Sequence, residues 1–204
     1  MSEGNSLFTL AFIAMLISAV AAGYSYISTN NYKENLITGF GTSVGTINLS
    51  VETLAEVNFT TNSINFLSGK VNTGGANATL DTSLGTVVGG NWTANSAGFV
   101  VENIGNVNVT LDLKTGKSAA TFIGGTNPQY QFNVTNTEVG SCTNASYTLA
   151  TFADVNTTNP GTRICNVFGF ANAADRIRID VKLVIPSDSY TGALGDYFTA
   201  TFAG

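Results

Sequence analysis

Hydrophobic and polar positions divide the chain into one apolar segment and one long region of alternating residues. Residues 4–32 carry no charged side chain, and the stretch from Leu7 to Ile27 within them is almost wholly apolar. A helix of about 21 residues spans roughly 30 Å, which is enough to cross a bilayer or to line the core of a helical bundle. The pattern therefore predicts an N-terminal hydrophobic α-helix in a first domain, residues 1–32, that acts as a filament core or a membrane anchor.

Small and bulky side chains recur at helical spacing within this segment. The small ones lie three or four positions apart and so share one stripe, which permits close approach of another backbone. The bulky ones follow a different stripe and supply packing volume. We expect this surface to pack against other helices through Leu7, Phe8, Leu10, Ala11, Phe12, Ala14, Met15, Ser18, Ala21 and Ala22.

A removed secretory signal peptide is the alternative interpretation of the same segment. Its apolar region would also be rich in Ala and Leu, and Ala19, Ala21 and Ala22 would supply a cleavage site. However, no Lys or Arg precedes the apolar run, whereas a signal peptide begins with a basic region. We therefore favour a helix that is retained.

Residues 33–204 are predicted to form a β-rich second domain. Charged and apolar side chains alternate without a break over residues 176–183, which is typical of a strand with one solvated face. Similar alternation predicts further strands whose inward residues are Ile47, Leu49 and Val51; Val107, Val109, Leu111 and Leu113; Tyr130, Phe132 and Val134; and Phe198, Ala200 and Phe202. Glycine-rich turns separate these strands. The predicted fold class is thus mainly β, a hydrophobic helix followed by an antiparallel immunoglobulin-like β-sandwich.

Composition indicates a weakly charged surface. Charged residues make up 10% of the chain, against roughly 25% in typical soluble proteins, so Asn, Thr, Ser and Gly must cover most of the exterior. The net charge is −5 and no basic cluster occurs. We therefore expect no nucleic-acid partner.

Asn-x-Ser/Thr acceptor sites for N-linked glycans occur at eight positions, a number only modestly above what the composition would give. They are Asn48, Asn58, Asn77, Asn91, Asn108, Asn133, Asn144 and Asn156. Asn48, Asn58, Asn108 and Asn133 fall at predicted outward positions of strands, where a glycan could project without displacing the core. The alternative interpretation is that polar residues simply occupy outward positions.

The chain has two cysteines, Cys142 and Cys165. In an oxidising compartment we expect them to form one disulfide that closes an irregular surface loop and adds about 3 kcal/mol of stability. Two unrelated buried thiols are the alternative. We expect no metal site, because two cysteines without any histidine cannot complete the usual set of four N or S ligands.

Catalysis is not expected, because the chain has no histidine and so lacks the most frequent general base. Residues 41–45 match the G-x-S-x-G pattern, but we interpret them as a glycine-rich turn. Residues 115–118 end like a phosphate-binding loop, but Leu111 stands where its first glycine should be and the flanks look like strands. No catalytic residue and no cofactor, apart from N-linked glycans, is therefore predicted.

This combination of an apolar N-terminal helix and a sequon-bearing β domain resembles archaeal type IV pilins and archaellin-like filament subunits. In that family a short leader ends in Gly, and here Gly4 followed by Asn5 looks like such a cleavage site. The chain departs from the family pattern at Glu3, where a Lys or Arg is usual. It also has Thr9 where bacterial relatives commonly have Glu.

The resemblance implies a structural subunit of an extracellular, glycosylated filament, with helices packed in the core and sandwiches outside. It also implies a membrane-inserted precursor, a homo-oligomeric helical assembly at the cell surface, and contacts with other cell surfaces.

Two other functions fit the same pattern. One is a membrane-anchored, adhesin-like module, for which the candidate binding aromatics are Trp92 and the Phe168–Phe170 cluster. The other is a secreted subunit that polymerises when an N-terminal strand such as Leu36–Leu49 inserts into a neighbour's sheet. All three interpretations place the protein outside the cell.

Overall fold

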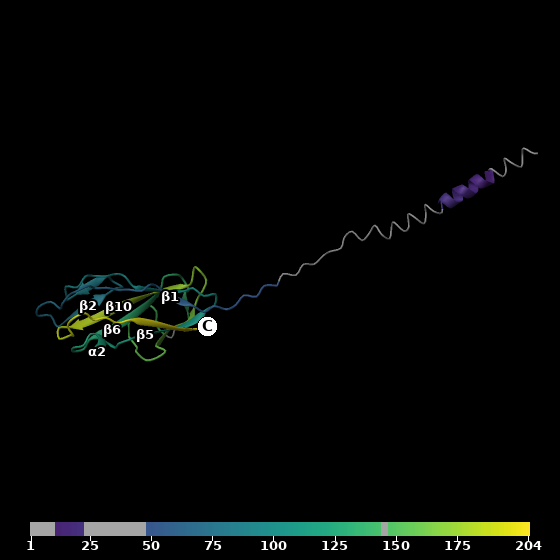
Figure 1. Cartoon of the computed structure of the whole chain (residues 1–204). Coiled ribbons are helices and arrows are strands. Elements are labelled where there is room, and N and C mark those ends of the chain that lie inside the picture. The colour runs from purple at the N-terminus through teal and green to yellow at the C-terminus, as the bar shows by residue number, and fades with distance from the viewer. Residues whose placement is uncertain (1–10, 23–47, 144–146) are drawn as a thin grey trace, which may run out of the picture. The chain divides into compact units, whose positions relative to one another are not determined.

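The computed structural model describes residues 11–22, 48–143 and 147–204 (Figure 1). The chain divides into two compact units, Met1–Ser50 and Val51–Gly204. The second unit, called the β domain below, contains strands β1 to β11 and the one-turn helix α2 (Ala119–Phe122). The protein is therefore mainly β, as the alternating pattern predicts.

The predicted hydrophobic helix of membrane-spanning length is not seen. Residues 11–22 are helical, which corresponds to about 18 Å, whereas a membrane span needs about 20 apolar residues. Within the described residues, no helix is both long and apolar enough to cross a membrane. The fold-class prediction is wrong in this respect. The remainder of the predicted helix and the domain boundary at residues 32 and 33 lie outside the described residues.

The larger of two antiparallel sheets is built around β10 (Arg176–Pro186). β6 (Gln129–Asn136) pairs along one edge of β10. The opposite edge is shared, because β4 (Phe99–Asn103) pairs with its first half and β2 (Asn77–Asp81) with its second half. The outer strands of this sheet are β1 (Val57–Thr61), β3 (Thr86–Val88) and β8 (Ala153–Asp154).

The smaller sheet has the order β11-β5-β9-β7. Its strands are β11 (Phe198–Ala203), β5 (Val109–Thr115), β9 (Thr162–Phe168) and β7 (Cys142–Thr143). The two sheets pack face to face, since one core cluster joins Val101, Phe132 and Ile177 of the larger sheet to Leu111 and Ile164 of the smaller. A second cluster fills the space beneath β2, β6 and β10.

The immunoglobulin-like part of the fold prediction is also wrong. An immunoglobulin constant domain divides its strands four and three between two sheets. Here the sheets have seven and four strands, and two strands share one edge of β10. Alternation along a strand identifies its inward face, but it carries no information about which strands become neighbours.

Four of the predicted strands are present in the structure, and one is not. Residues 48–56 form no strand, and Leu49 and Val51 are exposed, while Ile47 lies outside the described residues. The Asn106 side chain instead binds the backbone here, because its Nδ2 donates to Glu52 O and its Oδ1 accepts from Leu54 N. A side-chain amide therefore satisfies backbone groups that a strand partner would otherwise satisfy.

The strand pairings define two opposite ends of the β domain. At one end Val57 pairs with Asn103, and the C-terminal Gly204 lies close to Val109. At the other end Phe198 pairs with Thr115, and α2 follows directly after β5. We call the second the α2 end, and Figure 1 shows α2 there, away from the C-terminus.

Candidate functional site

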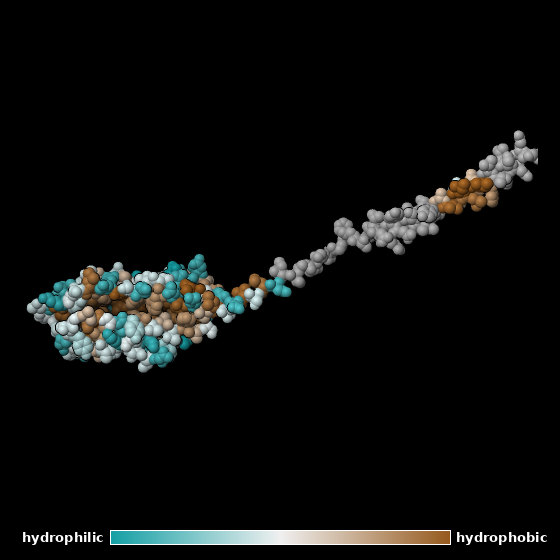
Figure 2. Space-filling model, viewed as in Figure 1, coloured by the Kyte–Doolittle hydropathy of each residue, from teal (hydrophilic) through white to brown (hydrophobic). Residues whose placement is uncertain are grey.

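The helical segment 11–22 is apolar and uncovered. Every residue in it is exposed, with Met15 and Val20 each at 70% of their full accessible surface. Figure 2 shows this segment as the hydrophobic part of the described N-terminal unit. The Ser18 hydroxyl donates to the carbonyl of Ala14 at 2.8 Å, so its polar group is satisfied within the helix.

The predicted packing residues fall partly on this segment. Ala11, Phe12, Ala14, Met15, Ser18, Ala21 and Ala22 belong to it and are exposed. Leu7, Phe8 and Leu10 lie outside the described residues, as do Gly4 and Asn5 of the predicted leader.

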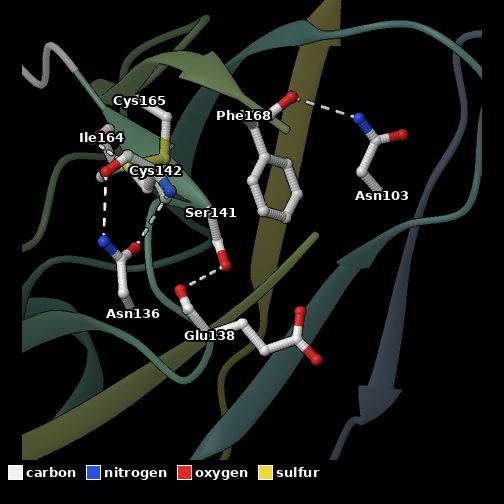
Figure 3. The surroundings of a disulfide bond; sticks show 8 residues. All are labelled: Asn103, Asn136, Glu138, Ser141, Cys142, Ile164, Cys165 and Phe168. Atoms are coloured by element: carbon white, nitrogen blue, oxygen red, sulfur yellow. Dashed lines mark hydrogen bonds between the residues drawn. A yellow bond between two sulfur atoms is a disulfide. The ribbon is translucent and has the colours of Figure 1, made fainter. Parts of the chain in front are cut away.

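The predicted disulfide is confirmed between Cys142 and Cys165, whose Cα atoms are 5.3 Å apart (Figure 3). Both cysteines are buried in the core between the sheets, and the bond closes the predicted excursion between them, most of whose described residues are exposed or half-buried. The Asn136 amide supports it, since Oδ1 accepts from Cys142 N at 3.0 Å and Nδ2 donates to Cys142 O at 3.2 Å. The end of β6 is thereby tied to β7 of the other sheet.

The segment between the cysteines crosses the β domain twice. It leaves β7 in the smaller sheet, forms β8 in the larger sheet, and returns to the smaller sheet as β9. β7 and β8 have two residues each, so their few hydrogen bonds hold this excursion weakly. The disulfide fixes its base.

Replacing both cysteines with alanine is expected to lower the free energy of unfolding by about 3 kcal/mol, because the closed loop restricts the unfolded chain. Urea denaturation of the oxidised wild type and the double variant measures the difference. The variant should not respond to a reductant, which serves as the control. Equal stability of the two proteins would show that the disulfide stabilises nothing.

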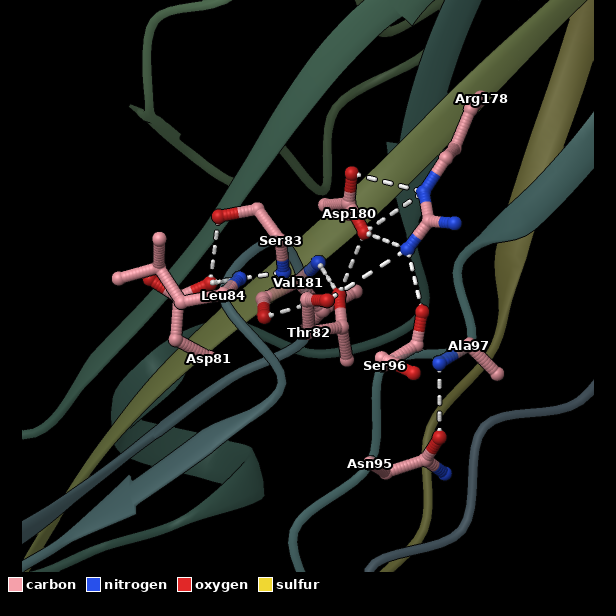
Figure 4. Close-up of polar contacts among 10 residues, drawn as sticks. All are labelled: Asp81, Thr82, Ser83, Leu84, Asn95, Ser96, Ala97, Arg178, Asp180 and Val181. Atoms are coloured by element: carbon pink, nitrogen blue, oxygen red, sulfur yellow. Dashed lines mark hydrogen bonds and ion pairs between the residues drawn. The ribbon is translucent and has the colours of Figure 1, made fainter.

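A polar network closes the gap where β2 and β4 share the edge of β10 (Figure 4). Arg178 Nε lies 3.0 Å from both carboxylate oxygens of Asp180, and its Nη2 donates to Ser96 O at 2.5 Å. Hydrogen bonding to Asp180 raises the pKa of Arg178 above its ordinary value. These residues were predicted to lie on a solvated face, but the carboxylate of Asp180 is buried.

Thr82, which follows β2 directly, makes the hydrogen bonds to the β10 backbone in this gap between β2 and β4. Its backbone N–H donates to Val181 O at 3.0 Å. Its hydroxyl accepts from Val181 N at 2.8 Å and donates to Asp180 Oδ1 at 2.9 Å. One hydroxyl therefore satisfies both a backbone group and a buried carboxylate.

The variant Thr82→Val is expected to be about 1–3 kcal/mol less stable than the wild type, because it leaves the Val181 N–H and the Asp180 carboxylate each short of one hydrogen bond. Thr82→Ser, which keeps the hydroxyl, is the matched control and should lose less than half as much. Thermal unfolding of the three proteins measures this. If the valine and serine variants were equally stable, the hydroxyl would have no such role.

Two other arginines of the β domain form ion pairs. Arg163 Nε lies 2.7 Å from Asp112 Oδ1, and this hydrogen bond raises the pKa of Arg163. Arg176 lies 3.0 Å from Glu102 and 3.4 Å from Glu138. Among the described residues, no group of three or more potential metal-binding side chains occurs.

A cavity of about 340 Å³ lies beside the segment that connects β7 and β9. Its two titratable side chains are engaged elsewhere, since the Tyr147 hydroxyl donates to Phe132 O and Arg163 pairs with Asp112. The other side chains that line it carry only hydroxyl and methyl groups. The cavity is lined by Tyr147, Thr148, Thr151, Ala153, Thr162 and Arg163.

The two motifs considered for catalysis gain no support. Residues 41–45 lie outside the described residues. Residues 115–118 connect β5 to α2, where Ser118 caps the helix, so one predicted strand flank is in fact a single helical turn. Lys117 Nζ donates to Gly195 O at 2.6 Å rather than facing an open loop.

The acceptor asparagines differ in accessibility. Asn48, Asn58, Asn77, Asn91 and Asn108 are exposed, and Asn156 is half-buried. Asn144 lies outside the described residues. Asn133 is only 7% exposed, so the prediction that it lies in an accessible position is wrong. Its strand β6 lies between β10 and β8, and Asn133 itself pairs with the buried Asp180 of β10.

Asn133 is expected to carry no glycan in the folded protein, because a buried amide cannot reach a transferase without local unfolding. The exposed Asn58 provides the comparison within the same molecule. Glycopeptide mass spectrometry of protein recovered from its native source measures occupancy at both sites. A glycan on Asn133 would contradict this expectation.

The aromatic residues considered for binding lie mostly in the interior. Phe168 is fully buried, and Trp92 packs on the backbones of Gly69 and Gly90. Phe170 is partly exposed. Two exposed tyrosines at the α2 end, Tyr190 and Tyr197, were not singled out from the sequence, because an isolated tyrosine in a polar segment gives no local signal of exposure.

The geometry described above thus offers one uncovered apolar segment and a β domain whose described polar groups are mainly paired. Comparison with known proteins does not identify a family for the chain. No protein-family model matches the chain, and neither a curated protein nor a solved structure matches it.

Proposed function

We propose that the chain is a structural subunit of an extracellular filament, assembled by packing residues 11–22 of each copy against the same residues of other copies. The uncovered apolar segment 11–22 is the observation that carries this proposal. Apolar surface in water costs about 25 cal/mol per Å². A segment with every side chain exposed and none charged therefore favours association.

The sequence of the segment supports contact between like copies. Ala14, Ser18 and Ala21 lie at helical spacing and present a stripe of small side chains, which permits close approach of two backbones. The Ser18 hydroxyl already donates to the Ala14 carbonyl, so burying it leaves no donor unsatisfied. The bulky Phe12, Met15 and Leu16 supply the surrounding packing surface.

The β domain supports an extracellular location for this filament. A buried disulfide forms and persists in oxidising surroundings. Because only 10% of all residues are charged, the surface depends little on pH and salt. We assign the β domain a structural role rather than a catalytic one.

The proposal is tested by purifying the full chain in a mild detergent, removing the detergent by dialysis, and examining the product by negative-stain electron microscopy. The expected product is filaments of uniform diameter that sediment at high speed. Dispersed monomers or shapeless aggregates after detergent removal would contradict the proposal. Circular dichroism at each stage confirms that the β domain stays folded.

A further inference from the structure

We propose that the α2 end of the β domain binds neutral carbohydrate through the ring faces of Tyr190 and Tyr197. Tyr190 is 56% exposed and Tyr197 is 65% exposed. By contrast, Tyr130 and Tyr147 are buried in the core. Large exposed aromatic side chains that the fold does not need for packing indicate a binding surface.

Each of these two rings lies against a glycine. A Cβ atom added at Gly124 would come within 2.6 Å of the Tyr190 ring, and one added at Gly116 within 2.7 Å of the Tyr197 ring. Each ring therefore contacts a glycine, and at Gly116 the Asp196 carboxylate lies equally close. Both tyrosines nevertheless remain more than half exposed.

Backbone hydrogen bonds hold both tyrosines beside α2. Tyr190 N donates to Ile123 O at 2.9 Å, just after the helix. Gly116 N donates to Tyr197 O at 3.2 Å, just before it. The two rings thus sit at either end of a single helical turn on a supported backbone, so little conformational freedom is lost when a ligand stacks on them.

The surroundings of the rings suit a neutral polyhydroxyl ligand. Asp188 accepts from Thr126 N at 2.9 Å and from its hydroxyl at 2.7 Å. These bonds lower the pKa of Asp188, so its exposed carboxylate stays ionised as a hydrogen-bond acceptor.

Carbohydrate matches this combination of groups better than nucleic acid does. The C–H bonds on one face of a pyranose ring are attracted to the negative face of an aromatic ring, while its hydroxyls bind the polar groups around it. Nucleic acid would require a basic surface, but the chain has a net charge of −5. Between the two tyrosines the chain carries Thr191, Gly192, Gly195 and Asp196, and Leu194 is 44% exposed.

Affinity electrophoresis of the full chain tests this proposal, with mannan, dextran or arabinogalactan cast into native gels. The protein is kept dispersed in a polyoxyethylene detergent, which has no sugar headgroup. Tyr190→Ala and Tyr197→Ala remove the rings, and Tyr190→Phe and Tyr197→Phe keep them. Val139→Ala changes a residue that is 95% exposed at the opposite end and is the matched control.

We expect at least one polysaccharide to retard the wild type, and each alanine variant to bind it about tenfold more weakly. The phenylalanine variants and Val139→Ala should bind like the wild type. The proposal is overturned if none of the three polysaccharides retards the wild type, or if the double alanine variant is still retarded. Filament formation involves residues 11–22 instead, so this result is independent of the proposed assembly.

Discussion

The variant Ser18→Asp is expected to form no filaments. Ser18 lies on the small-residue stripe of the exposed segment 11–22, and packing of copies would bury its side chain. A buried, unpaired carboxylate costs several kcal/mol, and every copy would bring one into the assembly. High-speed sedimentation after detergent removal should therefore leave nearly all of this variant in the supernatant.

Ser18→Ala is the matched control, because it keeps a small side chain without charge and should assemble like the wild type. The unfolding transition of the β domain should be the same in all three proteins, since Val51–Gly204 is a separate compact unit. Normal filaments from Ser18→Asp would refute packing through this stripe. Failure of both variants to assemble would point to a role for the hydroxyl itself.

Phe132→Ala is expected to lower the free energy of unfolding of the β domain by about 3–5 kcal/mol, because it removes a buried aromatic side chain and leaves a cavity. Phe132 is 1% exposed in the core between the sheets. Its ring stacks on Tyr147 with centroids 5.3 Å apart and meets the edge of Phe198 at 6.3 Å. Urea denaturation followed by circular dichroism measures the loss.

Val139→Ala should change stability by less than about 0.5 kcal/mol, since its side chain is almost fully exposed. It controls for the general effect of shortening an apolar side chain. A loss below about 1 kcal/mol for Phe132→Ala would mean that the two sheets do not pack through this ring.

The inward faces of the strands could be predicted because they depend on local alternation. Val109, Leu111 and Leu113 of β5 and Ile177 and Ile179 of β10 are buried as expected. Period two assigns each side chain to a face, and the core covers the apolar face.

The environment of the outward faces could not be predicted in the same way. Asp180, Asp112 and Asn133 were expected in solvent, yet all three are buried. Asp180 binds Arg178 two residues away, but its other side-chain partner, Thr82, and the Ser96 carbonyl that accepts from Arg178 are far away in sequence. No local pattern contains such long-range partners.

The candidate sites show the same limit. Two cysteines make one pairing, so the disulfide could be predicted, but its buried position depends on β7, which is too short to recognise from alternation. The apolar character of residues 11–22 was plain from the sequence. The contacts of Tyr190 with Gly124 and of Tyr197 with Gly116 arise only in the folded chain.

Packing of residues 11–22 between copies is the central claim, and a helical reconstruction of wild-type filaments by electron cryomicroscopy tests it most directly. The account predicts that these residues contact the same residues of neighbouring copies and are shielded from solvent. A filament joined only through contacts between β domains, or through a strand inserted into a neighbour's sheet with residues 11–22 left uncovered, would contradict it.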